Sequence, residues 1–343
     1  MLVPVLYGLQ VYHFTRGEPD IVIGYAREIL ALGTSTGDRR ALLLGERVGG
    51  SAYFLLGKLA ESRAAYENLL LLYDSQVDGR MVSDTTRNPM VAGYTFLSIC
   101  LTVMGYPEQG LATAERGLRQ AEELLHAISL VFGLRRGCIQ HMLMREVART
   151  RRRAAELLTL SVSYETFKGE PEGTLFESWA ILHETNDDAA HRRLLLALKQ
   201  LDDTKNWAFL PFLMSAAAEL TWRRGDQAGS MTLLNRATEL VALTGERWCE
   251  AEVLRLRARI PPAETADRVA LLRQSLALAA EQGARLWELR SAVDLARIWR
   301  DEGLVADAAD LLGPICGWFT EGFDLPDFIE AKALLDSMTR AAA

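Results

Sequence analysis

The densest group of side chains that could do chemistry in this 343-residue chain is the segment His183–His191, with two histidines and three carboxylates in nine residues. Two histidines bind zinc from one helix when they stand one turn apart, as in H-E-x-x-H, and this segment has a different spacing. Its Asn186-Asp187-Asp188 is typical of a turn that caps the next helix. We therefore interpret the segment as an interhelix turn. An enzyme would need His183, Glu184 and His191 to converge on a cleft.

Other catalytic and metal motifs are incomplete. Cys138 and His141 stand three residues apart, but a zinc site needs two further ligands, and none follows at a suitable spacing. Gly57-Lys58 is followed by Leu59 and lacks the first glycine of a phosphate-binding loop, which is replaced by Ala52. Neither G-x-G-x-x-G nor G-x-S-x-G occurs. We predict no catalytic, cofactor-binding or metal-binding residues, and the sequence does not identify the residues that bind a partner.

Composition excludes several classes of protein. The chain is 49% hydrophobic and 24% charged, as folded globular proteins are, and its net charge of −7 gives no general attraction to nucleic acid or anionic lipid. The basic run Arg149–Arg153 is interpreted as a solvated helix start beside acidic neighbours. No apolar stretch approaches the roughly 18 residues that span a bilayer. We expect neither a nucleic-acid nor a membrane partner.

The cysteines and the first residues predict a cytoplasmic protein. Four cysteines are widely separated, and three lie in apolar helical patterns, which favours reduced thiols over a disulfide framework. The apolar start, Met1–Phe14, lacks a basic region and a small-residue cleavage site, so it is interpreted as the first helix and not as a signal peptide.

A glycine-containing turn recurs about every 40 residues between helix-like segments, at Gly17, Gly57, Gly105, Gly225 and Gly303. A fixed period of this length indicates stacked helical hairpins. We therefore predict an all-α fold, an α-solenoid of about eight tetratricopeptide-like hairpins with a C-terminal capping helix. Residues 1–343 would form a single superhelical domain.

The apolar periodicity assigns helices to each hairpin. The expected pairs are 4–13 with 21–30, 41–56 with 60–73, 90–104 with 108–126, 127–144 with 147–167, 175–184 with 189–201, 207–223 with 227–244, 248–260 with 265–282, and 284–300 with 305–319. A last helix opens at Leu325-Pro326-Asp327 and ends near Arg340. Asp74–Asn88 is expected to be a long loop, and Lys168–Gly173 a linker.

Two further patterns concern the second half of the chain. The turns at Arg145-Glu146 and Asn186-Asp187 lack glycine and bracket a short, irregular fifth hairpin, so we expect a possible bend near 168–206 and look there for function outside a regular stack. All seven tryptophans are also in this half, and their helical spacing predicts that they fill the core between hairpins: Trp179, Trp207, Trp222, Trp248, Trp287, Trp299 and Trp318.

Three stretches resemble a bacterial family of signalling proteins. They are Thr244–Glu252 (TGERWCEAE), Gly283–Arg290 (GARLWELR) and Trp318–Asp327 (WFTEGFDLPD), the last followed by Glu330–Leu335 (EAKALL). They are similar to the C-terminal tetratricopeptide-like region that, in this family, follows a class III adenylate/guanylate cyclase domain, or another regulatory domain, and an AAA-type ATPase module. Neither of those domains is in this chain, so neither activity is carried over. The chain departs from the family at Ile260–Ala263, where relatives have a longer helix end and a glycine turn.

These observations leave three hypotheses about function. The leading one is a non-catalytic regulatory module that binds a protein or peptide, with an attached or separate ATPase or cyclase as the partner that the resemblance implies. The alternative is a small-molecule receptor with a ligand pocket inside the superhelix. The third is the free-standing enzyme that depends on His183, Glu184 and His191.

Overall fold

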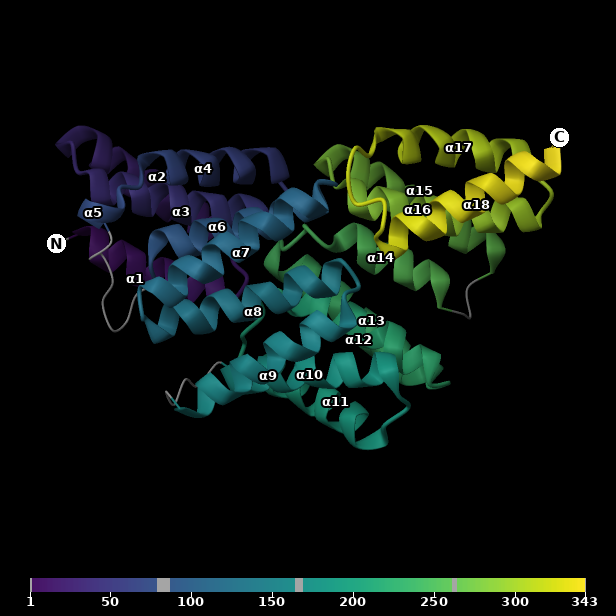
Figure 1. Ribbon diagram of the computed structural model, residues 1–343, viewed down its shortest axis with the longest axis horizontal. Helices are drawn as coiled ribbons and strands as arrows, with labels where there is room; N and C mark the ends of the chain where they lie inside the picture. The colour runs from purple at the N-terminus through teal and green to yellow at the C-terminus, as the bar shows by residue number, and fades with distance from the viewer. Residues whose placement is uncertain (1, 79–86, 164–168, 261–263, 343) are drawn as a thin grey trace.

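The computed structural model describes residues 2–78, 87–163, 169–260 and 264–342 (Figure 1). Regular structure in these ranges consists of helices alone, and none of them is both long and apolar enough to cross a membrane. The helices are α1 (Leu2–Thr15), α2 (Pro19–Thr36), α3 (Arg39–Leu55), α4 (Leu59–Leu72), α5 (Ser75–Asp78), α6 (Pro89–Val103), α7 (Pro107–Glu123), α8 (Ala127–Leu143), α9 (Val147–Ser163), α10 (Gly169–Glu184), α11 (Asp188–Asp203), α12 (Leu210–Arg223), α13 (Gln227–Thr244), α14 (Glu250–Arg259), α15 (Thr265–Gln282), α16 (Arg285–Asp301), α17 (Val305–Trp318) and α18 (Pro326–Ala342).

The long helices pair into eight hairpins, and α18 stands alone at the end. The first helix of each hairpin packs against its own mate and against the first helix of the next hairpin, from α1 on α3 to α14 on α16 and α16 on α18. We call these first helices the inner helices. The predicted all-α solenoid with a capping helix is therefore confirmed in the part of the chain that the structure describes.

Turn geometry explains the 40-residue period. Gly17, Gly57 and Gly105 end their inner helices with φ of +66°, +74° and +93°, a left-handed conformation that glycine adopts without steric cost. After α8 the corresponding residue is Arg145, with φ of +58°. The chain thus makes the same turn there with an arginine, which a search for recurring glycines does not detect.

Two expectations about the middle of the chain were wrong. Residues 169–173, predicted to lie in a linker, belong to α10, because Pro171 lies in the first turn, where its missing N–H is not needed for a helical hydrogen bond. The fifth hairpin is regular, since α10 and α11 each have 16 residues.

In the expected loop 74–88, α5 forms and Asn88 caps α6 by accepting from Met90 N and Val91 N. Pro261-Pro262 lie outside the described residues, and the single domain with a bend near 168–206 stays a prediction.

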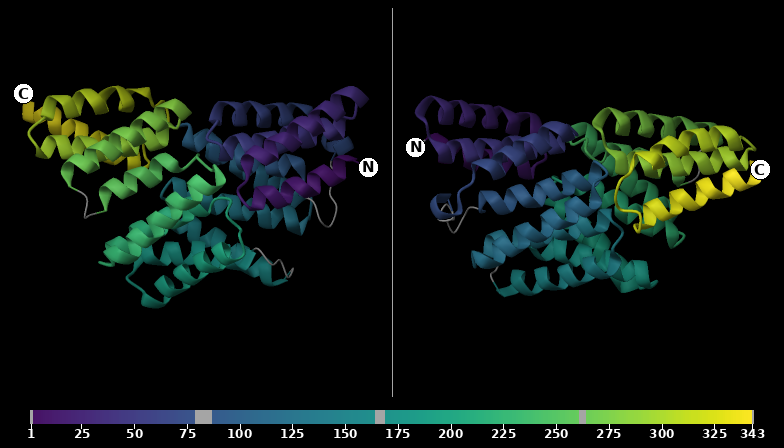
Figure 2. Two further views of the ribbon diagram at one scale, coloured as in Figure 1. Left: turned by 180° about the vertical axis from the view of Figure 1, so that it is seen from behind. Right: turned by 45° about the horizontal axis from the view of Figure 1, so that its top comes forward.

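The hairpins form two arms that meet along their length. The first arm (α1–α9) runs from α1–α4 at the upper left of Figure 1 to α9 at the bottom, and the second arm (α12–α18) runs from there to the upper right. The α10–α11 hairpin lies at the bottom, where the arms join (Figures 1 and 2). Backbone groups join the arms: Trp207 N donates to Thr15 O at 2.9 Å, and Arg247 N donates to Leu55 O at 2.6 Å. The turns of the first arm thus dock onto junctions between hairpins of the second.

Aromatic side chains fill the space between the arms. Phe54 of α3 lies 4.9 Å from Trp248, and Phe96 of α6 lies 5.9 Å from Phe209, measured between ring centroids. Trp248 and Trp287 are fully buried. Tryptophans were expected to fill the core, and for these two the burial is confirmed. The periodicity did not indicate that the core joins hairpins so distant in sequence.

This docking predicts unequal effects of two glycine substitutions. Gly105 and Gly225 both have φ near +90°, but a Cβ on Gly105 would lie 2.6 Å from the Trp318 ring, whereas a Cβ on Gly225 would meet nothing within 4 Å. Gly225→Ala should cost about 1–2 kcal/mol from backbone strain alone. Gly105→Ala should cost about 1–3 kcal/mol more because the arms are forced apart. Urea unfolding measures both, and equal losses would show that the arms do not pack at Gly105.

Candidate functional site

The three residues of the enzyme hypothesis do not converge. His183 packs on Trp179 with ring centroids 4.2 Å apart, Glu184 pairs with Arg151 at 2.6 Å, and the His191 ring contacts the Thr221 hydroxyl at 3.0 Å. The interpretation of His183–His191 as an interhelix turn is confirmed, since Asp187 caps α11 by accepting from Ala190 N.

Cys138 and His141 of α8 have different surroundings. The Cys138 thiol is fully buried, whereas His141 Nδ1 lies 2.7 Å from Glu146. Among the described residues, no group of three or more His, Cys, Asp or Glu side chains could hold a metal ion. All four cysteines are free and buried.

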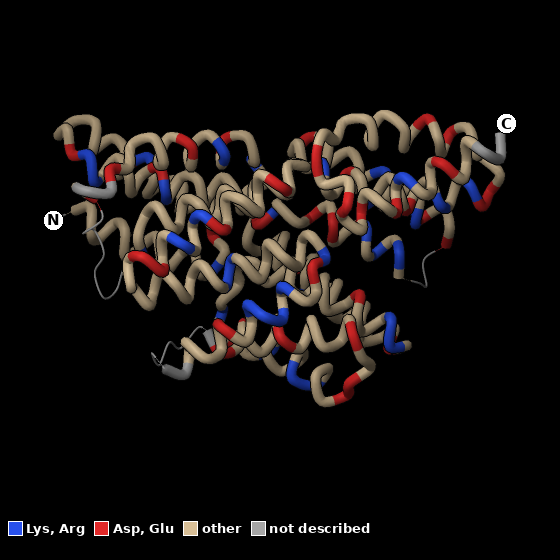
Figure 3. The backbone as a smooth tube through the Cα atoms, in the orientation of Figure 1, with Lys and Arg blue, Asp and Glu red and all other residues tan. Residues whose placement is uncertain are grey.

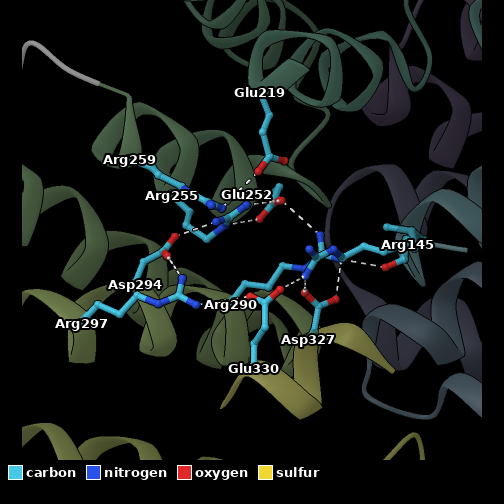
Figure 4. Close-up of polar contacts among 11 residues, drawn as sticks. Arg145, Glu219, Glu252, Arg255, Arg259, Arg290, Asp294, Arg297, Asp327 and Glu330 are labelled. Atoms are coloured by element: carbon cyan, nitrogen blue, oxygen red, sulfur yellow. Dashed lines mark hydrogen bonds and ion pairs between the residues drawn. The ribbon is translucent and has the colours of Figure 1, made fainter. Parts of the chain in front are cut away.

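A groove rich in ion pairs lies on the second arm, close to the Arg145 turn of the first arm (Figure 4). Basic and acidic residues are interspersed along both arms (Figure 3), but here the inner helices bring them together at helical spacing. We call this set the charged groove; its members are Arg145, Glu219, Glu252, Arg255, Arg259, Arg290, Asp294, Arg297, Asp327 and Glu330. It leaves a cavity of only about 80 Å³.

The centre of the charged groove is a chain of buried ion pairs. Arg255 lies 2.7 Å from Glu252 on its own helix, α14, and 2.6 Å from Asp294 of α16. The second of these ion pairs joins α14 to α16. Arg290 lies 3.1 Å from Glu252 and 2.7 Å from Asp327, which join α14, α16 and α18. Each buried charge in this network is in contact with an opposite charge. The low dielectric of the interior therefore strengthens the ion pairs, and no charge of the network is buried without a partner.

Arg145 extends this network to the first arm. Its guanidinium lies 2.7 Å from Glu330 and 3.3 Å from Asp327, and Arg290 donates in the same place to Leu143 O at 2.7 Å. The turn at Arg145-Glu146 was singled out only because it lacks glycine. That missing glycine was the sequence signal for a side chain that connects the arms.

The protonation states in the charged groove suit binding better than proton transfer. Burial works to raise the pKa of Glu252, but the charges of Arg255 and Arg290 outweigh it and lower the pKa to about 2. Burial lowers the pKa of His183, which lines the groove, to about 4, with help from Arg223 and Arg145. At pH 7 the carboxylate is ionised and the imidazole is neutral, so neither is poised as a general acid or base.

The three stretches that carry the family resemblance all lie where the arms meet. Trp248 donates through its backbone to Leu55 O at 3.3 Å, and Trp287 Nε1 donates to Trp248 O at 2.9 Å. Glu321 accepts from Glu108 N at 2.8 Å and from Gln109 N at 3.1 Å, and so caps α7 of the first arm. These stretches therefore have a structural role at the contact between the arms.

Glu246 is the most deeply buried carboxylate at this contact. It is fully buried and accepts from Phe209 N at 3.0 Å and Trp248 Nε1 at 2.7 Å. Burial raises its pKa to about 7, against the opposing effects of these hydrogen bonds and of the Arg136 charge.

A larger hollow lies between α1 and the α10–α11 hairpin. It has a volume of about 900 Å³, within the usual range for ligand sites. We call it the α1–α11 cleft; it is lined by Gly8, Val11, Tyr12, Thr15, Arg16, Glu170, Pro171, Thr174, Arg193, Leu196, Ala197, Gln200, Leu201, Thr204, Lys205 and Asn206. One wall of the cleft lies within 168–206, where function outside a regular stack was expected, but nothing in the sequence indicated that α1 forms the other wall.

Comparison with known proteins supports the fold. The chain resembles the apo form of RapI, with 11% identity, a TM-score of 0.50, and coverage of 86% of this chain and 99% of that one. It also resembles a Rap protein complexed with competence and sporulation factor, with 12% identity, a TM-score of 0.57, and coverage of 99% and 98%. No protein-family model and no curated protein matches the sequence. At these identities the likeness shows a shared fold of helical repeats.

The network across the arms predicts a large effect at Asp327. Asp327→Asn removes a nearly buried charge that faces Arg290 and Arg145 and should destabilise the fold by about 2–3 kcal/mol. Asp336→Asn, on the same helix, weakens an exposed pair with Lys332 and should cost less than about 1 kcal/mol. Urea unfolding compares the two, and a similar small loss in both would show that the contact between the arms does not depend on Asp327.

Glu246 predicts a pH dependence of stability. Its folded pKa lies above the ordinary value of 4.5, so as the pH rises the unfolded chain loses this proton first, and the folded state loses relative stability between about pH 4.5 and 7. Glu246→Gln lacks this titration. Between pH 4.5 and 7 its free energy of unfolding should therefore rise relative to that of the wild type by on the order of 3 kcal/mol. Urea unfolding at several pH values measures it, with the exposed Glu61→Gln as a control that should follow the wild type.

Proposed function

We propose that this chain is a non-catalytic regulatory module that binds an acidic, amphipathic peptide segment of a partner protein in the α1–α11 cleft. The observation that carries the proposal is the cleft itself, a hollow of about 900 Å³ between two helices that belong to distant hairpins. Helical-repeat proteins commonly bind partners on such extended surfaces, although the fold alone does not fix the function.

The walls of the cleft favour an apolar peptide face. Tyr12 from α1 and Leu196 from α11 line it, and each is 57% exposed. When a partner covers large apolar side chains that were exposed to water, the removal of their surface from water stabilises the complex. Two helices with a hollow between them can receive a third helix or an extended segment.

The rim of the cleft favours acidic side chains in the partner. Arg193 and Lys205 line it, are exposed, and have no ion pair among the described residues, whereas Arg16 is already paired with Glu18 at 3.0 Å. Glu170 is the one carboxylate in the lining. This excess of positive charge would attract an acidic partner and exclude a basic one.

The fold comparison supports ligand binding in general terms. One of the two similar structures is a Rap protein complexed with competence and sporulation factor, so a chain of this architecture can hold a ligand. An attached or separate ATPase or cyclase as the regulated partner rests on the family resemblance alone and stays a prediction. A small-molecule pocket at the centre of the superhelix is disfavoured, because the aromatic core occupies that space.

Selection from a displayed library of random 15-residue peptides tests the proposal. Sequences enriched on the immobilised chain should be acidic and amphipathic, and fluorescein-labelled copies can be titrated by anisotropy. Leu196→Glu should weaken their binding at least about tenfold, because it places a carboxylate against both the apolar and the acidic parts of the peptide. Leu71→Glu, at a more exposed site on α4 outside the cleft, should leave binding unchanged. Peptides that bind both variants alike, or that are basic, would contradict this site.

A further inference from the structure

The walls of the α1–α11 cleft are faces of two helices. The residues of α1 that line it recur every three or four positions, as residues on one side of a helix do: Gly8, Tyr12 and Thr15. The lining residues of α11 have the same spacing: Arg193, Leu196, Gln200 and Thr204. A Cβ atom on Gly8 would meet nothing within 4 Å, so the backbone of α1 is open to close approach there. The cleft is therefore a trough between two helices, in which a third helix can pack against both.

Both helices end at the same end of the cleft. Thr15, the last residue of α1, accepts a hydrogen bond through its carbonyl oxygen from Trp207 N at 2.9 Å, shortly after the end of α11. Arg16 and Lys205, which follow the two helix ends, line the cleft in this place. The C-terminal end of a helix carries a partial negative charge, and here two such ends lie close together.

The size and the backbone chemistry of the cleft favour a helical ligand over an extended one. A helix about 10 Å across fills a volume of about 900 Å³ over about two turns. An extended segment needs partners for its backbone N–H and C=O groups, but the backbone groups of α1 and α11 are paired along their own helices. A helix pairs these groups internally, so it can enter the cleft without leaving them unsatisfied.

We propose that the partner segment binds in the α1–α11 cleft as an α-helix of about two turns, with an acidic first turn directed toward Lys205. The inference rests on the proposed function and adds the conformation and the direction of the ligand. The positive N-terminal end of the bound helix then faces the negative ends of α1 and α11. Asp or Glu in its first turn stabilises the helix itself and also faces Lys205, which is exposed and has no ion pair among the described residues.

Proline substitution in the selected peptides tests the conformation. An alanine scan by anisotropy first locates the peptide residues that contact the cleft. A proline in the middle of this segment should weaken binding at least about tenfold, because it breaks the helix. A proline at the first helical position is the matched control and should change the affinity less than about twofold, since no helical hydrogen bond needs its N–H. A covalent link between side chains four residues apart, on the side away from the cleft, should strengthen binding, because so short a helix is unfolded before it binds.

The position of the acidic residues tests the direction. Two peptides of identical composition carry their Asp and Glu residues either in the first or in the last turn, and the first should bind at least about threefold tighter. Lys205→Glu should remove or reverse this preference. Lys199→Glu makes the same change of charge at an exposed position on α11 outside the cleft lining, and it should keep the preference.

The outcomes separate this inference from the proposed function. Peptides that are weakened by Leu196→Glu but tolerate the central proline would overturn the helical conformation and leave the binding site intact. Tighter binding with the acidic residues in the last turn, or a preference that Lys205→Glu does not change, would overturn the direction. If no selected peptide responds to Leu196→Glu, the binding site itself is wrong and both proposals fail.

Discussion

The structure depends on the contact in which turns of the first arm dock onto hairpin junctions of the second. At its centre, Leu55 O accepts from the backbone of both Arg247 and Trp248, and the rings of Phe54 and Trp248 pack directly beside these hydrogen bonds. A solenoid whose units touched only their neighbours would leave these turn carbonyls in water. Here they are satisfied by backbone more than 190 residues away along the chain, so each arm supplies part of the other's core.

This contact also decides where a ligand can bind. The inner helices of an open superhelix line a concave surface, but here aromatic side chains such as Phe96, Phe209 and Phe212 occupy that space. The charged groove is similarly filled, because its ion pairs leave about 80 Å³. A hollow of about 900 Å³ remains between α1 and the α10–α11 hairpin. The same packing that stabilises the arms therefore fills the centre of the superhelix, and the proposed binding site lies outside it.

The sequence predicted what depends on local pairing and missed what depends on the contact between arms. Glycine turns and apolar periodicity report on helices adjacent along the chain, so the hairpins and the cap were predicted correctly. Pro171 was interpreted as part of a linker because proline in the first turn of a helix looks the same in sequence as proline in a loop. The stretch TGERW was recognised as a box, yet nothing in one sequence says that Trp248 faces Phe54 or that Glu246 caps Phe209 N. Arg145 was indicated only by its replacement of a turn glycine, and for the α1–α11 cleft only the wall within 168–206 was indicated, not its contact with α1.

The distribution of charge between the arms carries information that the net charge of −7 hides. In the second arm, each buried arginine of the charged groove touches carboxylates, as Arg255 touches Glu252 and Asp294, so the interior there is balanced by the chain itself. In the first arm, Arg47 is buried and donates to the Tyr7 hydroxyl, but it has no ion pair among the described residues. A buried guanidinium without a carboxylate in contact costs stability, so the interior of the first arm keeps a positive charge of a kind that the second arm balances with its own carboxylates.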